Sequence, residues 1–370
     1  MFFQHTIECI NKTFQVKRIA YFGKNFLLCF LQHKKSFQKI NYFKNSLSCF
    51  LGLKRVLGSP MLLCIEPTNV CDQKCTICET GLGILEREKK FLSFDQFKDI
   101  LNQFDNNLEI MYFYFMGEPF LNKDSYKMIQ YAANRGIWVS TCTNGNQIDP
   151  NELINSGIGE INFQISGMTQ EIHEIYRRGG NLKNVFATVE ESLRIRDLIF
   201  GRNKARPKIN LGFILMKHNE HQVDEFIHYC KKTGVDNYNI IGTCLREHSQ
   251  GDQLLPTDTS YWIYDEAAFE KGLLIPKYRP NNYCEWIYFT TTILVNGDVV
   301  PCCRDPCGKY ILGNVFDKKF NVIWNNTNYQ DLREIVAKNS NNFELCRLCS
   351  GYVTPILHPV SDLIKVLVSN

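Results

Sequence analysis

The segment Leu62-Leu-Cys-Ile-Glu-Pro-Thr-Asn-Val-Cys-Asp-Gln-Lys-Cys-Thr-Ile-Cys78 joins a short apolar run to three closely spaced cysteines. The run Met61–Ile65 is predicted to form a buried strand, and Cys71, Cys75 and Cys78 fall in the loop that follows it. Three thiolates are one short of a closed tetrahedral zinc site, and on a 4Fe–4S cube they leave one iron open. The loop therefore predicts a metal centre that can bind a ligand directly. From the spacing alone, a zinc knuckle or a chance cluster remains the alternative.

Downstream of this loop, apolar runs alternate with helical patterns as far as residue 242. The further predicted strands are Glu109–Phe115, Ile137–Thr143, Glu160–Ile165, Lys208–Leu215 and Asn237–Ile241. The predicted helices are Ser93–Phe104, Lys123–Asn134, Asn181–Ile199 and Glu220–Lys232, with shorter ones near 150–156 and 169–177. Six β–α units in series predict an α/β fold, a partial (β/α)6 parallel barrel with right-handed crossovers. Functional groups are expected at the carboxyl ends of its strands.

Composition narrows the class of protein. The 370 residues are 44% hydrophobic and 22% charged, which is typical of a globular chain rather than a disordered or coiled-coil one. No apolar run approaches the roughly 20 residues of a membrane span, and the net charge of +4 argues against a dedicated nucleic-acid binder. Sixteen cysteines without a recognisable secretory signal predict a cytoplasmic protein whose clustered thiols bind metal.

Motifs at the predicted strand ends accompany the cysteine loop. They are Met116-Gly117-Glu118-Pro119, Thr143-Asn144-Gly145, Gln164-Ile-Ser166-Gly167 and Tyr176-Arg177. Taken singly, the first two are also compatible with ordinary turns. Together with the C-x3-C-x2-C spacing they resemble the radical S-adenosylmethionine (SAM) superfamily over roughly residues 60–350.

This resemblance implies a cofactor, a reaction and a set of contacts. A 4Fe–4S cluster on Cys71, Cys75 and Cys78 would chelate SAM, and one electron from a donor such as flavodoxin or ferredoxin would release a 5′-deoxyadenosyl radical. The implied SAM-binding residues are Gly117, Glu118, Asn144, Gln164, Ser166 and Arg177. Glu118 would accept from the SAM ammonium and Arg177 would pair with its carboxylate. Ser166 stands where relatives have Asp, and Gln164 where they have Ser.

A second group of cysteines lies near the end of the chain. Cys284 precedes a hairpin signal at Asn296-Gly297, Cys302 follows it, and Cys346 and Cys349 complete the set. The hairpin is predicted from Ile287–Leu294 and Val299–Pro301, and short helices from Phe320–Asn325 and Tyr329–Lys338. This string resembles the SPASM/twitch extension of radical SAM enzymes. The resemblance implies one auxiliary 4Fe–4S cluster, with a zinc ribbon as the alternative and Cys303 and Cys307 as spare thiols.

We divide the chain into five parts. Residues 1–59 form a basic, aromatic leader, because residues 1–60 contain ten Lys or Arg and a single acid, Glu8. Ile19, Phe22, Phe26 and Phe30 have helical spacing, so this leader either packs on the body or touches a membrane surface or partner peripherally. Residues 60–242 form the barrel, 243–283 a loop-rich linker, 284–355 the auxiliary cluster domain and 356–370 a tail.

Three functions remain open from the sequence. The first is two-electron oxidation of a small-molecule or sugar-type substrate, with the auxiliary cluster as electron acceptor. The second is modification of a peptide or protein by the same radical chemistry. The third is a non-enzymatic iron–sulfur or zinc scaffold that docks a partner or membrane. The catalytic base is not identified, and Lys217, just after the fifth strand, is only a positional candidate.

Overall fold

The computed structural model describes residues 35–201, 206–277 and 282–351. The chain divides into two compact units. We call Ile65–Lys98 with Ile110–Ile263 the parallel unit, and the segments up to Cys64, Asp99–Glu109 and from Tyr264 onward the hairpin unit. The strand β1 (Leu62–Ile65) and the helix α5 (Phe94–Leu101) fall across the divisions between these segments.

The parallel unit contains five parallel strands in the order β6-β5-β4-β3-β2. These strands are β2 (Ile110–Tyr112), β3 (Trp138–Thr143), β4 (Glu160–Ile165), β5 (Lys208–Leu215) and β6 (Asn237–Gly242). They agree with the predicted strands, and only β2 is clearly shorter. The predicted α/β class with a parallel sheet is confirmed.

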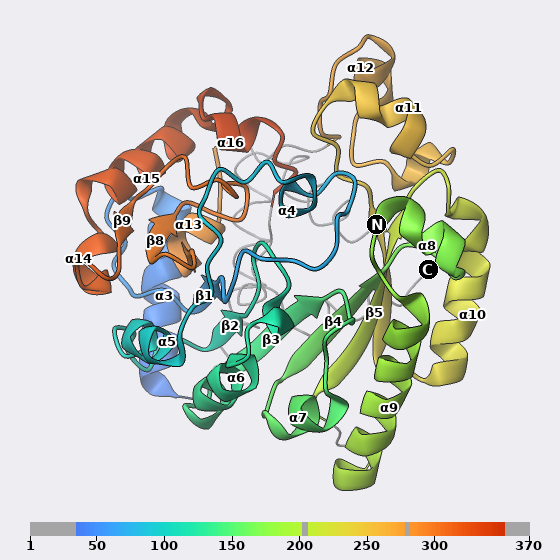
Figure 1. Ribbon diagram of the computed structural model, residues 1–370. Coiled ribbons are helices and arrows are strands. Elements are labelled where there is room, and N and C mark those ends of the chain that lie inside the picture. The colour runs from blue at the N-terminus through green and yellow to red at the C-terminus, as the bar shows by residue number, and fades with distance from the viewer. Residues whose placement is uncertain (1–34, 202–205, 278–281, 352–370) are drawn as a thin grey trace. The chain divides into compact units, whose positions relative to one another are not determined.

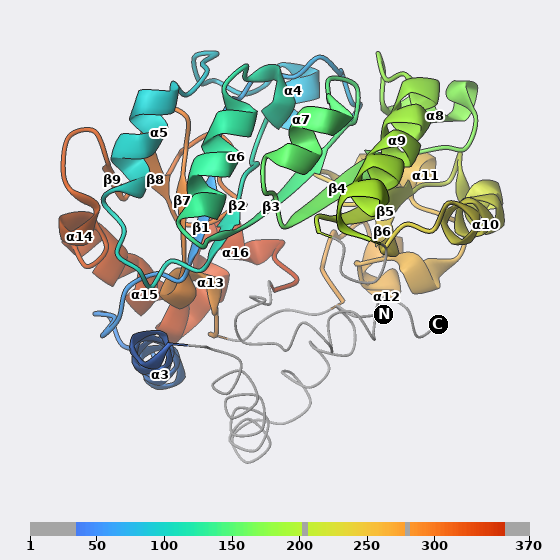
Figure 2. The same cartoon turned by 90° about the horizontal axis from the view of Figure 1, so that it is seen from below.

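Helices follow the strands as the sequence predicted. They are α6 (Ser125–Asn134), α7 (Pro150–Asn155), α8 (Gln170–Tyr176), α9 (Leu182–Phe200) and α10 (Val223–Thr233). Both ribbon views place α6, α7 and α9 against the same face of the strands (Figures 1 and 2). Ile161, Phe163 and Ile165 of β4 are fully buried, whereas the alternating Glu160, Asn162 and Gln164 are half-buried on the opposite face. The sheet therefore has an apolar face and a polar face.

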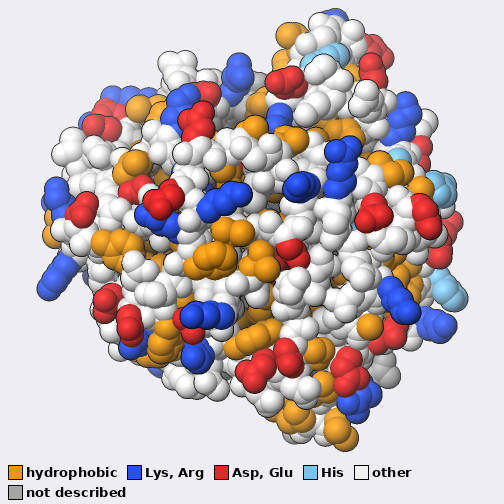
Figure 3. Space-filling view, in the orientation of Figure 1, with side chains coloured by type: hydrophobic (Ala, Val, Ile, Leu, Met, Phe, Trp, Pro, Cys, Tyr) orange, Lys and Arg blue, Asp and Glu red, His pale blue; other side chains and the backbone are white. Residues whose placement is uncertain are grey.

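Two local features of the helices are a capping contact at the start of α5 and an exposed apolar end of α9. At the start of α5, the backbone N–H of Gln96 donates to Oγ of Ser93 at 3.2 Å, and that of Ser93 donates to Oε1 of Gln96 at 3.1 Å, so the two residues form a capping box. The space-filling view shows hydrophobic side chains where α9 ends, and Leu198 there is 76% exposed (Figure 3).

The hairpin unit contains strands in the order β1-β7-β8-β9. The strands β7 (Thr290–Ile293) and β8 (Asp298–Val300) pair antiparallel, and β9 (Gly313–Asn314) pairs with β8. Gly297 adopts a φ of 86° at the turn, so the predicted hairpin is confirmed. The expected strand start was wrong, because Trp286–Phe289 forms the helix α13. Its first N–H groups, those of Trp286 and Ile287, donate to the sulfur of Cys284, which turns the chain there.

Helices complete this unit and the region predicted as a linker. The hairpin unit also contains α3 (Ser36–Leu51), α12 (Glu266–Glu270), α14 (Phe320–Ile323), α15 (Thr327–Asn339) and α16 (Glu344–Arg347). The region predicted as loop-rich contains short helices, among them α11 (Gly251–Leu254) and α12. The division between the two units also falls within it, at Ile263 and Tyr264.

The described part of the leader is helix α3. Asn41 and Asn45 donate to the carbonyl of Ser59 at 2.9 and 2.7 Å, and Tyr42 is fully buried against Phe289. This helix therefore packs on its own unit, mainly through polar side chains. The pattern from Ile19 to Phe30 lies outside the described residues, and membrane contact stays a prediction. Among the described residues, no helix is long and apolar enough to span a membrane.

Candidate functional site

The loop that carries the first three cysteines is held by its own flanks. Asn69 donates from Nδ2 to the carbonyl of Glu88 at 2.8 Å and accepts from the N–H of Lys90 at 2.8 Å. The fully buried Glu66 forms a two-pronged ion pair with Arg87, both contacts being 2.7 Å. Such paired contacts fix geometry as well as contributing energy, so the cysteines lie on a loop closed at its base.

The three thiols lie close enough to influence one another. Burial raises the pKa of Cys71 to about 12, and the neighbouring Cys75 raises it further. Burial also raises the pKa of Cys75, with a contribution from Cys78 and an opposing one from Arg177. The site therefore favours neutral thiols until a metal replaces their protons. No group of three or more metal-binding side chains in the described part of the chain is arranged around a single ion position.

A backbone contact to sulfur recurs at both groups of cysteines. The N–H of Gln73 lies 3.4 Å from Sγ of Cys71, and the N–H of Arg304 lies 3.4 Å from Sγ of Cys302. The N–H of Gly351 lies 3.3 Å from Sγ of Cys349. In each case the donor is two residues after the cysteine. Hydrogen bonds to sulfur stabilise thiolates and tune iron–sulfur clusters, so these loops fit such clusters.

The turn after β2 approaches the cysteine loop through its backbone. Gly117 has a φ of 80°, and a β-carbon there would lie 2.6 Å from the carbonyl oxygen of Thr68. Next to it, the N–H of Glu118 donates to the carbonyl of Val70 at 2.8 Å. A glycine is therefore required at this position, because any side chain would collide with the loop.

The Glu118 carboxylate binds the end of β3. It accepts from Oγ1 of Thr143 at 2.8 Å, from the N–H of Asn144 at 2.8 Å and from the N–H of Phe120 at 3.3 Å. Burial raises its pKa to about 7, against the lowering effect of these donors. Sequence reasoning did not anticipate this role of Glu118 in joining two strand ends.

The amide of Asn144 reaches the first cysteine. Its Nδ2 donates to Oδ1 of Asp72 at 2.6 Å and lies 3.9 Å from Sγ of Cys71. Asn146 and Gln147 also donate to Asp72, at 3.3 and 3.2 Å. The carboxylate of Asp72 thus gathers three amides from the loop after β3. Asn144 therefore lies at the cluster loop, and its contact with SAM stays a prediction.

Arg177 lies beside Cys75 at the end of α8. Here the cysteine loop contacts the segment that follows α8, since the N–H of Lys74 donates to the carbonyl of Arg178 at 2.9 Å. Arg177 is 7% exposed, and its Nε has no hydrogen-bond partner within the described structure. A buried donor of a cation left without an acceptor is costly, so this site favours an anion at Nε. The carboxylate of SAM would supply one, which is the clearest fit of these residues to that cofactor.

The two remaining predicted SAM contacts differ from each other. Ser166 is fully buried, and its Oγ donates to the carbonyl of His173 at 3.0 Å, so its hydroxyl is already used. Gln164 lies across Gly212, where a β-carbon would lie 2.5 Å from its Oε1. That oxygen has no partner in the described residues. Gln164 therefore retains a free acceptor for a ligand, whereas Ser166 supports α8.

Arg246 is a residue of the site that the sequence did not reveal. Its guanidinium donates to the carbonyl of Ile77 at 2.8 and 2.6 Å and pairs with Glu79, so it clamps the loop at Cys78. No motif marks it, because it comes from the loop after β6. Lys217 is exposed and donates to the carbonyl of Asp252 at 2.9 Å, which gives it no evident role as a base.

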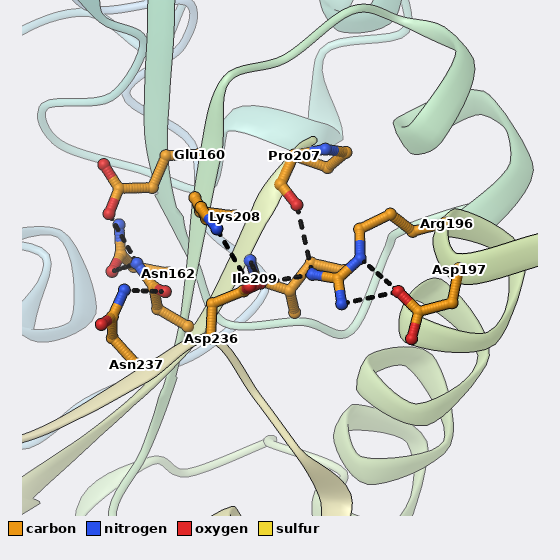
Figure 4. Close-up of polar contacts among 10 residues, drawn as sticks. Glu160, Asn162, Arg196, Asp197, Pro207, Lys208, Ile209, Asp236 and Asn237 are labelled. Carbon is orange, nitrogen blue, oxygen red and sulfur yellow. Dashed lines mark hydrogen bonds and ion pairs between the residues drawn. The ribbon is translucent and has the colours of Figure 1, made fainter. Parts of the chain in front are cut away.

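The polar face of the sheet carries a row of amides. Asn162, Asn210 and Asn237 stand in register on β4, β5 and β6. Nδ2 of Asn210 lies 3.1 Å from Oδ1 of Asn162, and Nδ2 of Asn237 lies 3.1 Å from Oδ1 of Asn210 (Figure 4). Asn210 also donates to Glu160, whose pKa is raised by burial. The amides of this row therefore hydrogen-bond mainly to one another and to Glu160.

In the hairpin unit, the four cysteines of the second group line one pocket. Cys284, Cys302, Cys346 and Cys349 all contribute to its wall, which is largely apolar, whereas Cys303 and Cys307 do not line it. Burial raises the pKa of Cys284, and Cys349 and Cys346 raise it further. This donor set fits a fully ligated iron–sulfur cluster.

A buried arginine holds this unit together. The guanidinium of Arg333 donates to the carbonyls of Ile287 and Trp324 at 3.1 and 3.0 Å, and it lies 4.6 Å from the ring centroids of Trp324 and Tyr329. Burial lowers its pKa to about 10. Arg333 and Trp324 therefore have a structural role, and the contact of Arg333 with the Ile287 carbonyl supports the start of α13 beside Cys284.

Comparison with known families agrees with this division of the chain. Residues 65–200 match the model of the radical SAM superfamily, and residues 284–350 match that of SPASM, an iron–sulfur cluster-binding domain. The first match contains Cys71, Cys75 and Cys78, and the second contains the four cysteines of the pocket. The family and the cofactors expected from the sequence, SAM with its 4Fe–4S cluster and an auxiliary iron–sulfur site, are confirmed.

Curated relatives and solved structures give the same result. The chain is 24% identical over 326 residues to the mycofactocin maturase MftC of Mycolicibacterium smegmatis, covering 80% of this chain and 79% of the relative. It is 22% identical over 312 residues to the cofactor-modifying protein of tungsten-containing aldehyde ferredoxin oxidoreductase from Pyrococcus furiosus, covering 75% and 84%. Streptococcus suis SuiB bound to the precursor peptide SuiA superposes with a TM-score of 0.58 at 16% identity, covering 85% and 76%. The expected partial-barrel fold is confirmed.

Proposed function

Because the chain belongs to the radical SAM superfamily and carries a C-terminal SPASM domain, we propose that it is a maturase that modifies a peptide substrate. Cys71, Cys75 and Cys78 would hold a 4Fe–4S cluster, which when bound would supply the electron for reductive cleavage of SAM and so for hydrogen abstraction from a substrate residue. Cys284, Cys302, Cys346 and Cys349 would hold an auxiliary cluster, which would supply the electron acceptor for a net two-electron oxidation.

The residues of the parallel unit position SAM for this step. Arg177 pairs with the SAM carboxylate, since its side chain is buried beside Cys75 and its Nε has no hydrogen-bond partner among the described residues. Gly117 lets the turn after β2 approach the loop, and Glu118 fixes the end of β3 so that Asn144 lies at Cys71. Gln164 contributes its free Oε1. These contacts orient the sulfonium before the electron arrives.

The row of amides on the polar face is the structural reason for proposing a peptide substrate. A peptide backbone alternates N–H and C=O groups, and side-chain amides complement both. Asn162, Asn210 and Asn237 stand in one such row in the amino-terminal halves of β4, β5 and β6, where they hydrogen-bond to one another, and a bound peptide would exchange its own groups for these contacts. The relatives named as mycofactocin maturases support the same choice. The first function expected from the sequence, oxidation of a small molecule or sugar, has less support from the comparisons than this alternative.

The test compares substrate classes under identical conditions. The anaerobically reconstituted and reduced chain is incubated with SAM and either a synthetic peptide pool or a pool of sugars and aminocyclitols. We expect peptides to acquire a mass change and to stimulate 5′-deoxyadenosine formation. A sugar or aminocyclitol product without any peptide product would contradict the proposal.

Two matched variants test whether the amide row binds the peptide substrate. Asn162→Leu should lower the peptide product about fivefold while the peptide-independent cleavage of SAM stays within about twofold, since a buried amide contact contributes about 1 kcal/mol. Asn155→Ala, on the exposed surface of α7, should change neither rate. An equal loss of peptide product in both variants would show that the amide row does not bind the peptide.

A further inference from the structure

A buried glutamine lies between the first two cysteines of the loop. Gln73 is 2% exposed, and its Oε1 lies 3.7 Å from Sγ of Cys75, which donates to it as a neutral thiol. Its Nε2 has no partner within the described residues. A buried amide donor left unpaired destabilises the structure. The orientation of this amide therefore suits a protonated Cys75 and leaves its donor group unused.

A fully buried histidine in α8 has a second unused donor. The N–H of Ser166 donates to Nδ1 of His173 at 3.4 Å, so Nδ1 is the acceptor and the neutral ring carries its proton on Nε2. Nε2 has no partner among the described residues. Burial lowers the pKa of His173 to about 3, with a contribution from Arg177, so the ring stays neutral.

The two unused donors face the same point in space. A β-carbon built on Gly180 would lie 2.6 Å from Nε2 of His173 and 3.0 Å from Nε2 of Gln73. Both nitrogens therefore border the space that the missing side chain of Gly180 leaves open. An acceptor placed there by Gln73 would lie beside the imidazole N–H.

We propose that Gln73 and His173 form a hydrogen-bond relay that turns toward Cys75 when the cluster is bound. Ligation removes the thiol proton of Cys75 to solvent, so its sulfur can only accept. Rotation of the Gln73 amide by half a turn exchanges its two ends. Nε2 then donates to the sulfur of Cys75, and Oε1 accepts from Nε2–H of His173, directly or through one water. One rotation pairs both donors that are otherwise unpaired.

The relay adjusts the reduction potential of the cluster. A donor to a ligating sulfur stabilises the reduced cluster, which carries the greater negative charge, and so raises the potential. His173 acts only through Gln73, and its neutral state fixes which end of the amide faces Cys75. This inference concerns the cluster alone and does not depend on the substrate being a peptide.

The test is an EPR-monitored redox titration of the reconstituted full chain without SAM or substrate, together with its iron content. In Gln73→Met the equilibrium constant for one-electron reduction should fall about tenfold, which is about 59 mV toward lower potential. His173→Leu should shift the potential in the same direction by less, because the donor remains but loses its orientation. Iron content should stay unchanged in both.

Gln170→Leu is the matched control. Gln170 donates to the carbonyl of Gly180 at 2.8 Å and accepts from the N–H of Leu182 at 2.9 Å, and none of its hydrogen bonds is to a cysteine. Replacing Gln170 disturbs the segment around Gly180 without removing a hydrogen-bond donor to a cysteine sulfur, so the reduction potential of the cluster should not change. Unchanged potentials in Gln73→Met and His173→Leu, or an equal shift in Gln170→Leu, would overturn the relay. Failure of both relay variants to bind iron while Gln170→Leu binds it would also overturn it, since the pair would then only support the fold.

Discussion

The side chain of Asn144 donates a 2.6 Å hydrogen bond to the carboxylate of Asp72, the residue that follows the first cysteine of the cluster loop. The two residues are 72 positions apart in the chain, and the contact joins the end of β3 to the cysteine loop. The same amide lies 3.9 Å from Sγ of Cys71. The geometry of the first cluster site thus depends on a strand end that contributes no ligand.

Asn144→Ala should weaken SAM binding without removing iron. The variant loses the contact to the exposed Asp72 carboxylate, and we expect a loss of about 1 kcal/mol, or roughly fivefold in affinity. Anaerobic calorimetry with SAM and an iron assay measure both quantities. Asn155→Ala, which replaces an exposed asparagine at the end of α7, should bind SAM like the wild type. Loss of iron in Asn144→Ala would mean that the contact holds the cluster instead.

Arg177→Met should affect stability and binding in opposite directions. Removing a buried cation whose Nε has no hydrogen-bond partner among the described residues should raise the free energy of unfolding of the SAM-free chain, on the order of 1–3 kcal/mol. The same change should lower SAM affinity roughly tenfold to a hundredfold, because a charge-assisted contact contributes about 1.5–3 kcal/mol. Denaturant unfolding and SAM titration give the two results.

The neighbouring Arg178 provides the control for this trade-off. It is exposed, so Arg178→Met should leave both quantities close to the wild-type values. A destabilised Arg177→Met chain with unchanged SAM affinity would show that this arginine supports the fold rather than the cofactor.

The raised pKa of Glu118 predicts that the stability of the folded chain depends on pH. Its pKa is raised by burial from 4.5 to about 7, so the folded chain retains a proton that the unfolded chain has already released. Stability from this group is therefore fully present below pH 4.5 and is lost as the pH rises toward 7, by about 3 kcal/mol in total. Unfolding of the SAM-free wild type should show this decline between pH 5 and 7, whereas Glu118→Gln should show a flatter profile. Parallel profiles would mean that Glu118 titrates normally.

The auxiliary site predicts which thiols bind iron. Cys302→Ala and Cys349→Ala should each reduce the iron content from about eight to about four atoms per chain, since each removes one of four ligands to a 4Fe–4S cube. Cys303→Ser and Cys307→Ser should retain about eight, because neither thiol lines the pocket. Iron loss in Cys303→Ser with retention in Cys302→Ala would reverse the assignment.

Much of the fold follows from local patterns in the sequence. The strand β4 and the helix α9 were predicted almost to the residue, because alternating and helical spacings there are long and regular. Residues Ile287–Phe289 were assigned to a strand on their apolar character, but contacts to the Cys284 sulfur turn them into a helix. Such contacts between side chain and backbone leave no periodic signal.

The site was predictable only where a motif carries it. The cysteines and Arg177 stand in recognisable spacings, and the structure places Arg177 beside Cys75. Arg246 and His173 stand in no such spacing, since their positions depend on how distant strand ends meet. Ser166 stands at a motif position where relatives have Asp, and its hydroxyl is used by α8, since it donates to the carbonyl of His173. Sequence spacing identifies which residues gather at a strand end, and the tertiary contacts decide which of them stay free for a ligand.

The most direct test of the account is formation of 5′-deoxyadenosine from SAM by the reduced, reconstituted chain, compared with a variant in which Cys71, Cys75 and Cys78 are all alanine. We predict that the wild type forms the product and contains about eight iron atoms per chain. The triple variant should retain about four, bound by the hairpin unit, and form no product. Undiminished SAM cleavage by the triple variant would contradict the assignment of the radical-generating site.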